Sequence, residues 1–254
     1  MFEGRQGDCV ASFSTYQVAF MIITRHLPYL TLCLFRNWLS VFVGRRPAAC
    51  HDTMDIPSTC VLYRSYGEKP SWYLAQVPSG LLPAIKLDGK LMTESLTIMQ
   101  TLETVFPGNR PMLPDRDSQE FEDAVRLLNL ERELFSWWCQ FVFRSGDSAR
   151  EQFERTLDEV NDALSSSPGP WFLPSSAAEA ATGSPDEGFS LVDLTYVPHL
   201  ERMAASTAYW KGLQIRGNPR WPAINRWFEA LEMRETYMAT KSDFYTHVKD
   251  IPPQ

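Results

Sequence analysis

The sequence lacks the residue patterns that mark nucleotide-binding and metal-binding proteins. Its 254 residues contain no G-x-G-x-x-G, no Walker loop, no H-E-x-x-H and no C-x-x-C. Zinc ligands usually come in closely spaced pairs, whereas the four histidines are scattered along the chain: His26, His51, His199 and His247. We therefore predict no metal site, and ordinary core or surface positions for these histidines.

Cysteine and basic charge are also scarce. The chain has 5 cysteines at irregular spacings, and an odd number favours reduced thiols in an intracellular protein. The net charge of −7 and the pI of about 5.2 argue against nucleic acid, whose phosphates need a basic surface. The first residues lack a basic region leading into an apolar core, which does not support a secretory signal. We expect a cytoplasmic protein, with organelle targeting left open.

The longest apolar region is interrupted by charge. Residues 17–43 are long enough to cross a membrane, but they contain Arg25, His26 and Arg36. A charged side chain at bilayer depth costs roughly 2.5–3.5 kcal/mol on insertion scales. The charges argue against a membrane span and favour a strand at 17–24, for which a helix is the competing interpretation, followed by a helix at 28–43. A second strand is predicted at 59–64.

The most informative stretch begins at Lys69 and contains a β-hairpin pattern. Asp88-Gly89 is typical of a two-residue turn, because glycine adopts positive φ without a steric penalty. The flanking segments, 84–87 and 90–93, alternate apolar and polar residues as half-buried strands do. A helix is predicted to follow, with Ile98, Leu102 and Val105 on one face and Pro107 at its end.

The start of that helix has the chemistry of a small charged ligand site. Glu94 and Ser95 stand where unpaired backbone N–H groups attract a carboxylate. The Ser95 hydroxyl adds a hydrogen bond, and Glu94 can accept one from an ammonium group. The two residues together suit an α-amino-acid head group, such as a free γ-glutamyl group.

Pro83 stands at the start of a strand, the position where a missing N–H is tolerated. A cis peptide bond between Leu82 and Pro83 would turn the backbone groups of Leu82 outward, where they could pair with an extended peptide. We predict this cis bond.

These motifs together resemble the glutathione-binding half of the glutathione transferase superfamily. The matching residues are K-P-x-W from Lys69, then V-P-S-G-L-L-P-A-I, D-G-K, E-S and L-E-x-x-F-P, and the nearest pattern is the omega class with its plant and algal relatives. The resemblance implies an α/β thioredoxin-like domain at 17–107 and an all-α domain at 115–254. It also implies that glutathione is the co-substrate and is bound by Lys69, Leu82, Pro83, Glu94 and Ser95.

The segment before residue 60 departs from the pattern of that class. The omega class has Cys-Pro-x-Cys where this chain has Leu27-Pro28-Tyr29-Leu30, so both cysteines are missing. Cys33 is offset by more than a turn, and we interpret it as a small buried hydrophobe. The thiol-activating residue is therefore unknown. Two explanations fit: real divergence, or an incorrect gene model for residues 1–60.

The rest of the chain is predicted to be helical. The expected helices are 118–143, 148–164, one opening at Ser190 and 220–237, with a surface insertion at 175–188. Val125, Leu128, Phe135, Trp138 and Val142 are expected on the buried face of the first of these helices. The expected inward residues of the second are Phe153, Leu157, Val160 and Leu164, and those of the last are Trp221, Ile224, Phe228 and Leu231. Ser190-Leu-Val-Asp193 resembles the N-capping box of the superfamily, and Pro198 is expected to bend or end its helix.

Two functions follow from the resemblance. The first is an enzyme for glutathione-dependent transfer or thiol reduction on small hydrophobic or oxidised substrates, compatible with a homodimer. The second is a non-catalytic glutathione-binding or protein-interaction scaffold of the same fold. The missing cysteines favour the scaffold, and the complete peptide-binding pattern favours the enzyme.

Overall fold

The structure is a computed structural model of the chain. It describes residues 17–23, 58–63, 69, 71–81, 83–105, 112–144, 147–174, 188–234, 237–238 and 241–249. The predicted helix at 28–43, the Leu82-Pro83 peptide bond and the insertion at 175–187 lie outside these residues.

The first part of the chain forms a four-stranded sheet in the order β2-β1-β3-β4. Its strands are β1 (Gln17–Ile23), β2 (Ser58–Tyr63), β3 (Ala84–Leu87) and β4 (Lys90–Thr93). β1 pairs in parallel with β3 and antiparallel with β2, and β3 pairs antiparallel with β4. All four strands occur within a residue of the positions that the sequence predicts.

The pairing of β1 with β2 has a consequence for the first 60 residues. A strand–helix–strand unit joins strands that run in parallel, but β1 and β2 run antiparallel. β1 and β2 are therefore not the parallel pair of such a unit.

The predicted hairpin is present between β3 and β4. Asp88 has a φ of 47° and Gly89 a φ of 82°, the left-handed backbone that a two-residue primed turn needs at both central positions. The Asp-Gly pair thus fixes the register, in which Ala84 faces Thr93 at the open end of the hairpin.

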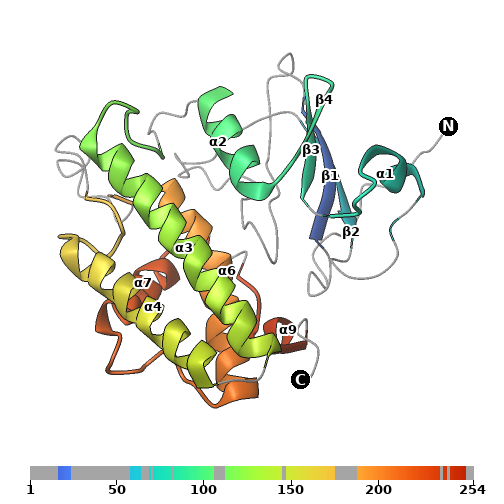
Figure 1. The fold of residues 1–254 in the computed structure, drawn as a ribbon. Coiled ribbons are helices and arrows are strands. Elements are labelled where there is room, and N and C mark those ends of the chain that lie inside the picture. The colour runs from blue at the N-terminus through green and yellow to red at the C-terminus, as the bar shows by residue number, and fades with distance from the viewer. Residues whose placement is uncertain are drawn as a thin grey trace.

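Seven helices lie within the described residues. Two accompany the sheet, α1 (Ser71–Gln76) and α2 (Ser95–Val105). The others are α3 (Gln119–Phe143), α4 (Asp147–Ser166), α6 (Leu191–Lys211), α7 (Pro222–Glu232) and α9 (Phe244–Lys249). In Figure 1, α2 lies between the sheet and the large helices, and α1 lies beyond the sheet on its other side.

One expectation for the buried face of α3 is wrong. Val125 is 43% exposed, whereas Ala124 is 1% exposed. Neighbouring helical positions point about 100° apart, so the alanine takes the inward direction and the valine points to solvent. Leu128, Trp138 and Val142 are buried as expected, and Phe135 is half-buried. Ser118 caps the helix, because its side chain accepts a hydrogen bond from the Phe121 N–H at 3.2 Å.

Helix α6 passes through Pro198 and continues to Lys211, so of the two expected effects of the proline, ending the helix early is ruled out, and a bend stays a prediction. A proline inside a helix costs about 3 kcal/mol. Nearly every residue from Leu191 to Thr207 is buried, and a helix that is buried all round lies at the centre of its domain. Tertiary packing outweighs the cost of Pro198.

Asp193 joins three segments at the start of α6. Its carboxylate accepts hydrogen bonds from the Ser190 N–H at 3.0 Å and the Ser190 hydroxyl at 2.9 Å. It also accepts from the Phe172 N–H at 3.3 Å and from Nε1 of Trp227 at 2.9 Å. Burial raises the pKa of Asp193 to about 6, and the hydrogen-bond donors oppose that shift.

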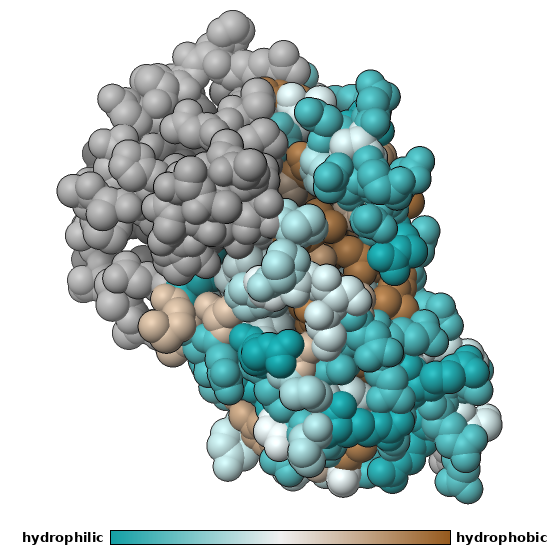
Figure 2. All heavy atoms as spheres, turned by 90° about the vertical axis from the view of Figure 1, so that its left-hand side faces the viewer, coloured by the Kyte–Doolittle hydropathy of each residue, from teal (hydrophilic) through white to brown (hydrophobic). Residues whose placement is uncertain are grey.

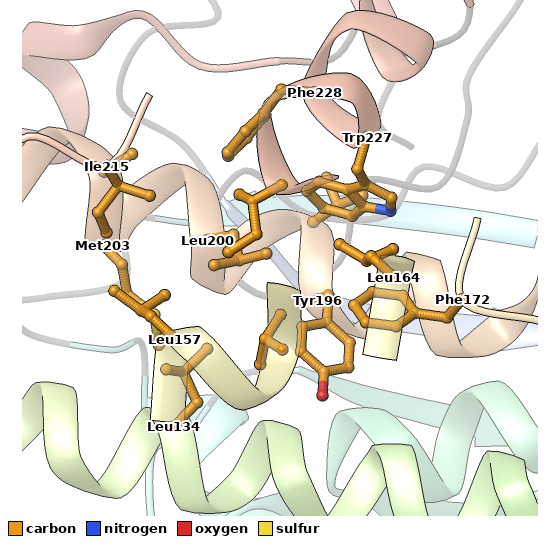
Figure 3. Packing of buried hydrophobic residues seen from close by; sticks show 14 of the residues in the cluster. Leu134, Leu157, Leu164, Phe172, Tyr196, Leu200, Met203, Ile215, Trp227 and Phe228 are labelled. Atoms are coloured by element: carbon orange, nitrogen blue, oxygen red, sulfur yellow. The ribbon is translucent and has the colours of Figure 1, made fainter. Parts of the chain in front are cut away.

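The main hydrophobic core lies among α3, α4, α6 and α7 (Figure 3). Phe172 stacks on Tyr196 with ring centroids 4.2 Å apart, and it meets Trp227 edge-on at 6.1 Å. The predicted inward residues of α4, namely Phe153, Leu157, Val160 and Leu164, are all buried. The predicted inward residues of α7 are buried too, although that helix is shorter than expected and ends at Glu232.

The sheet part and the helical part are in direct contact. Leu96 of α2 packs against the helical core. Glu103 of α2 accepts a hydrogen bond from the Met112 N–H at 2.7 Å, and the Met112 carbonyl accepts one from the Leu191 N–H at 2.8 Å. Helix α2 is thus held between the sheet and the start of α6.

Most of the coloured surface in Figure 2 is hydrophilic, and the hydrophobic residues gather mainly in one band, with smaller spots elsewhere. None of the helices within the described ranges is long and apolar enough to cross a membrane.

Candidate functional site

Several predicted site residues meet at one end of the sheet. The last pair of the β3–β4 ladder is Ala84 with Thr93, so Pro83 and Glu94 follow directly beyond it on adjacent strands. Residues opposite each other in such a ladder lie about 4.5–5.5 Å apart. The same end holds the beginning of β1, because Phe20 pairs with Ala84. The hairpin register therefore brings Pro83 close to the pair Glu94 and Ser95.

Glu94 has an unusual backbone conformation at this sheet end. Its φ is 70°, in the left-handed region that residues with a Cβ seldom adopt. Its carbonyl accepts a hydrogen bond from the Ile98 N–H at 2.9 Å, which makes Glu94 the residue that caps α2. The side chain is exposed and can meet a ligand from solvent. A strained backbone held in place by its surroundings is a feature of functional sites.

Ser95 is the first residue of α2 and is 9% exposed. Its backbone N–H belongs to the first turn, where N–H groups have no partner within the helix and carry the positive end of the helix dipole. Glu94, and not Ser95, holds the N-cap position of α2, so the Ser95 hydroxyl is not required for capping.

The remaining predicted residues flank this end of the sheet. Pro83 is buried directly before β3, and Leu82 lies outside the described residues. Lys69 is half-buried, and its Cγ lies 3.9 Å from where a Cβ on Gly80 would stand. Burial lowers the pKa of Lys69. Lys69 thus borders the loop that leads from α1 into Pro83.

Sequence reasoning missed Tyr73, the buried residue of α1 that contacts that loop. Tyr73 is 0% exposed, and its hydroxyl donates a hydrogen bond to the carbonyl of Leu81, two residues before Pro83. Burial raises the pKa of Tyr73 to about 12, so the phenol stays protonated and remains a donor at neutral pH. The signal in the sequence that could have identified Tyr73 was its position next to Trp72, in the helix that carries K-P-x-W.

The described residues offer little support for a reactive cysteine or for a metal site. Cys139 of α3 is half-buried, and burial raises the pKa of its thiol, which the charge of Arg202 opposes. A raised pKa leaves less of the reactive thiolate at neutral pH. Among the described residues, no three His, Cys, Asp or Glu side chains gather as a metal site would require.

The aromatic residues at the end of α3 divide between two environments. Trp138 is 2% exposed, and its Nε1 donates to Ser206 at 3.0 Å, which confirms a core role for one of the two adjacent tryptophans. Phe141 is also buried, stacked on Phe153. Trp137 is only partly buried, and its Nε1 donates to Glu133.

Comparisons with known proteins decide the family. The model of the glutathione S-transferase N-terminal domain matches residues 40–110, and that of the C-terminal domain matches residues 122–230. Glutathione S-transferase L1 of Arabidopsis thaliana is 31% identical over 180 residues, which is 69% of this chain and 67% of the relative. This chain belongs to the glutathione S-transferase family.

A second relative and a solved structure are also similar to this chain. Glutathione S-transferase L3 of Arabidopsis thaliana is 27% identical over 237 residues, covering 80% of this chain and 92% of the relative. The crystal structure of glutathione transferase Omega 3C from Trametes versicolor has a TM-score of 0.54 and 26% identity, over 69% of this chain and 74% of its own. The expected architecture, an α/β thioredoxin-like domain followed by an all-α domain, is confirmed.

The N-terminal domain model does not extend over the first strand. The N-terminal domain model starts at residue 40, so β1 at Gln17–Ile23 precedes the matched region. β1 is also the strand that pairs antiparallel with β2.

Proposed function

We propose that this protein is a glutathione-dependent enzyme for group transfer or thiol reduction on small hydrophobic or oxidised substrates. The observation that carries the proposal is the end of the β3–β4 hairpin, where Glu94, at a φ of 70°, and Ser95, at the start of α2, lie beside Pro83. This arrangement offers an anion site and an adjacent carboxylate, the two groups that a γ-glutamyl head requires.

Each predicted residue has a distinct part in the proposed complex. The N–H and hydroxyl of Ser95 hold the γ-glutamyl carboxylate, and the Glu94 carboxylate accepts a hydrogen bond from the ammonium group. The backbone of Leu82 and the adjacent Pro83 pair with the peptide, and Lys69 contributes positive charge toward the other carboxylate. The positive φ of Glu94 orients both its side chain and the first turn of α2 toward the same ligand.

The chemistry depends on the thiolate of glutathione, which is the nucleophile in transfer and in thiol–disulfide exchange. A positive helix end and a hydrogen-bond donor near the sulfur would lower its pKa. The helix predicted to follow Pro28 is the candidate source of that field, as an expectation from the sequence.

The wider assignment is also part of the proposal. It divides the chain into a glutathione-binding domain at 17–107 and an all-helical domain at 115–254, places the protein in the cytoplasm and assembles it as a homodimer. Support for the division comes from the two family models, which match on either side of residues 111–121.

The direct test is calorimetric titration of the full chain with glutathione, followed by turnover of an aryl halide and of a small mixed disulfide. We expect saturable binding and glutathione-dependent turnover of at least one acceptor. Saturable binding without turnover of any acceptor would favour the scaffold over the enzyme. An absence of binding would overturn the proposal as a whole.

Replacing Glu94 by glycine should raise stability and weaken binding together. Glycine adopts positive φ without strain, so we expect the free energy of unfolding to rise by about 0.5–1 kcal/mol. Loss of the carboxylate should lower the affinity for glutathione about two- to fivefold, as an exposed charge contributes modestly. Urea unfolding and calorimetric titration measure the two effects.

Asp88→Gly is the matched control for this variant. Asp88 also has a positive φ but lies at the opposite end of the hairpin, in the turn. It should gain similar stability and bind glutathione as the parent does. Equal affinity of Glu94→Gly and Asp88→Gly would remove Glu94 from the site.

A further inference from the structure

Helix α2 carries the proposed carboxylate site at its first turn and is held from two sides (Figure 1). Ile98, Met99 and Leu102 are buried, lie outside the hydrophobic core of the helical part, and belong to a helix that contacts β4. Leu96, in contrast, packs against that core. The helix therefore has one side toward the sheet and another toward the helical part.

Two contacts with the helical part lie on the same side of α2. Leu96 and Glu103 are seven positions apart in the helix. That spacing places two side chains within about 20° of each other around a helix and about 10 Å apart along its axis. The Glu103 carboxylate accepts the hydrogen bond from the Met112 N–H at 2.7 Å, and the Met112 carbonyl accepts from the Leu191 N–H at 2.8 Å. Glu103 is thus connected to the first turn of α6.

The two contacts differ in what they can fix. The apolar packing of Leu96 is non-directional and lets the helix turn about that point, whereas a hydrogen bond requires a defined distance and angle. Leu96 lies near the ligand end of α2 and Glu103 near the opposite end, so the hydrogen bond sets the direction of the helix axis. The N–H groups of the first turn and the helix dipole point along this axis. These are the groups proposed above to hold the γ-glutamyl carboxylate at Ser95.

We propose that Glu103 is a positioning residue for glutathione: by holding Met112, it orients α2 so that the N–H and hydroxyl of Ser95 face the γ-glutamyl carboxylate. This inference rests on the proposed function, since it assigns a role within the same site. Glu103 is not a catalytic residue, because its carboxylate binds the protein's own backbone near the other end of the helix. The helical part thereby contributes to the affinity of a site that lies on the sheet part.

Three replacements of Glu103 separate its hydrogen bond from its charge. Glu103→Ala removes the acceptor, Glu103→Asp keeps the charge on a shorter side chain, and Glu103→Gln keeps the length and an acceptor oxygen without the charge. We expect Kd and KM for glutathione to rise about three- to tenfold in the first two variants, the effect of one hydrogen bond, and by less than about twofold in Glu103→Gln. kcat at saturating glutathione should change little in all three, because the reacting groups are untouched.

Asn161→Ala is the matched control. Asn161 of α4 also accepts a hydrogen bond with its side chain from a backbone N–H near the start of a helix, that of Ala223 in α7, at 2.9 Å. This bond joins two helices of the helical part and does not involve α2. The variant should melt at a lower temperature than the parent and bind glutathione equally well. Equal weakening of binding in Asn161→Ala and Glu103→Ala would show that lost stability alone lowers the affinity, and the positioning role would be overturned.

Hydrogen exchange gives a readout that a purely structural role would leave unchanged. If the orientation held by Glu103 favours glutathione, then glutathione must favour that orientation by the same factor. Exchange of the Leu191 N–H, which donates to the Met112 carbonyl, should therefore slow in the parent and in Glu103→Gln when glutathione saturates the protein. In Glu103→Ala, saturation with glutathione should leave this exchange rate unchanged.

The outcomes separate this inference from the proposed function. If the parent binds no glutathione, both fail. If the parent binds and Glu103→Ala binds equally well, only the positioning role is overturned. It is also overturned if Glu103→Gln loses affinity while Glu103→Asp keeps it, because the charge and not the hydrogen bond would then act. If Glu103→Ala does not fold, Glu103→Asp replaces it in the same comparisons.

Discussion

Asp193→Ala is expected to lower the free energy of unfolding by about 4 kcal/mol, because it leaves four donors without their acceptor. These are the N–H and hydroxyl of Ser190, the N–H of Phe172 and Nε1 of Trp227. In a chain of this size, each kcal/mol shifts Tm by about 2–4 °C, so Tm should fall by about 10 °C. Urea unfolding at pH 8, above the raised pKa of Asp193, measures the effect.

The size of this effect follows from where the donors lie. Phe172 precedes α6 in the chain by about twenty residues, and Trp227 belongs to α7. Both rings belong to the aromatic cluster around Tyr196 (Figure 3). Loss of the carboxylate therefore removes the hydrogen bonds that link the start of α6 to two other segments of the core. It also removes the capping interaction of α6.

Ser190→Ala is the control for Asp193→Ala. It removes one donor to the same carboxylate and leaves the other three, so we expect a loss of about 1 kcal/mol. If Asp193→Ala costs no more than Ser190→Ala, the links to Phe172 and Trp227 contribute nothing to stability, and the capping role alone explains the residue.

Ser95→Ala is expected to weaken glutathione binding by roughly ten- to a hundredfold. A hydrogen bond to a charged group contributes about 1.5–3 kcal/mol, and each 1.4 kcal/mol is about tenfold in affinity. The variant keeps the backbone N–H and the dipole of α2, so the change reports on the hydroxyl. Calorimetric titration gives the affinity, and thermal melts show whether the fold is retained.

Stability should change little in Ser95→Ala, because Glu94 and not Ser95 caps α2. Thr97→Ala is the matched control: it removes an exposed hydroxyl two residues further along the same turn of the helix. It should bind glutathione as the parent does. If Ser95→Ala binds as tightly as Thr97→Ala, the carboxylate site is not at the start of α2.

Much of the candidate site could be predicted from sequence because its geometry is local. The Asp-Gly turn sets the register of β3 and β4, and that register alone brings Pro83 beside Glu94. The polar Glu-Ser pair after the strand indicated the helix start. The left-handed φ of Glu94 was not foreseen, because no side-chain pattern requires it there.

The family resemblance was confirmed over the region whose motifs are short and contiguous. The matched models begin at residue 40, and the departures noted in the sequence fall before residue 60. The helix predicted to follow Pro28, which we propose as the source of thiol activation, lies in that segment, outside the motifs that define the peptide-binding half.

By itself the sequence determined the strands, the hairpin, most helix positions and the inward faces of α4 and α7, because these follow from turn chemistry and periodicity. Only the tertiary structure decided which of Ala124 and Val125 faces the core, whether α6 continues through Pro198, and which distant groups share Asp193. It also joined Tyr73 to Leu81. Each of these depends on what packs against a residue from elsewhere in the chain, and spacing along the sequence does not contain that information.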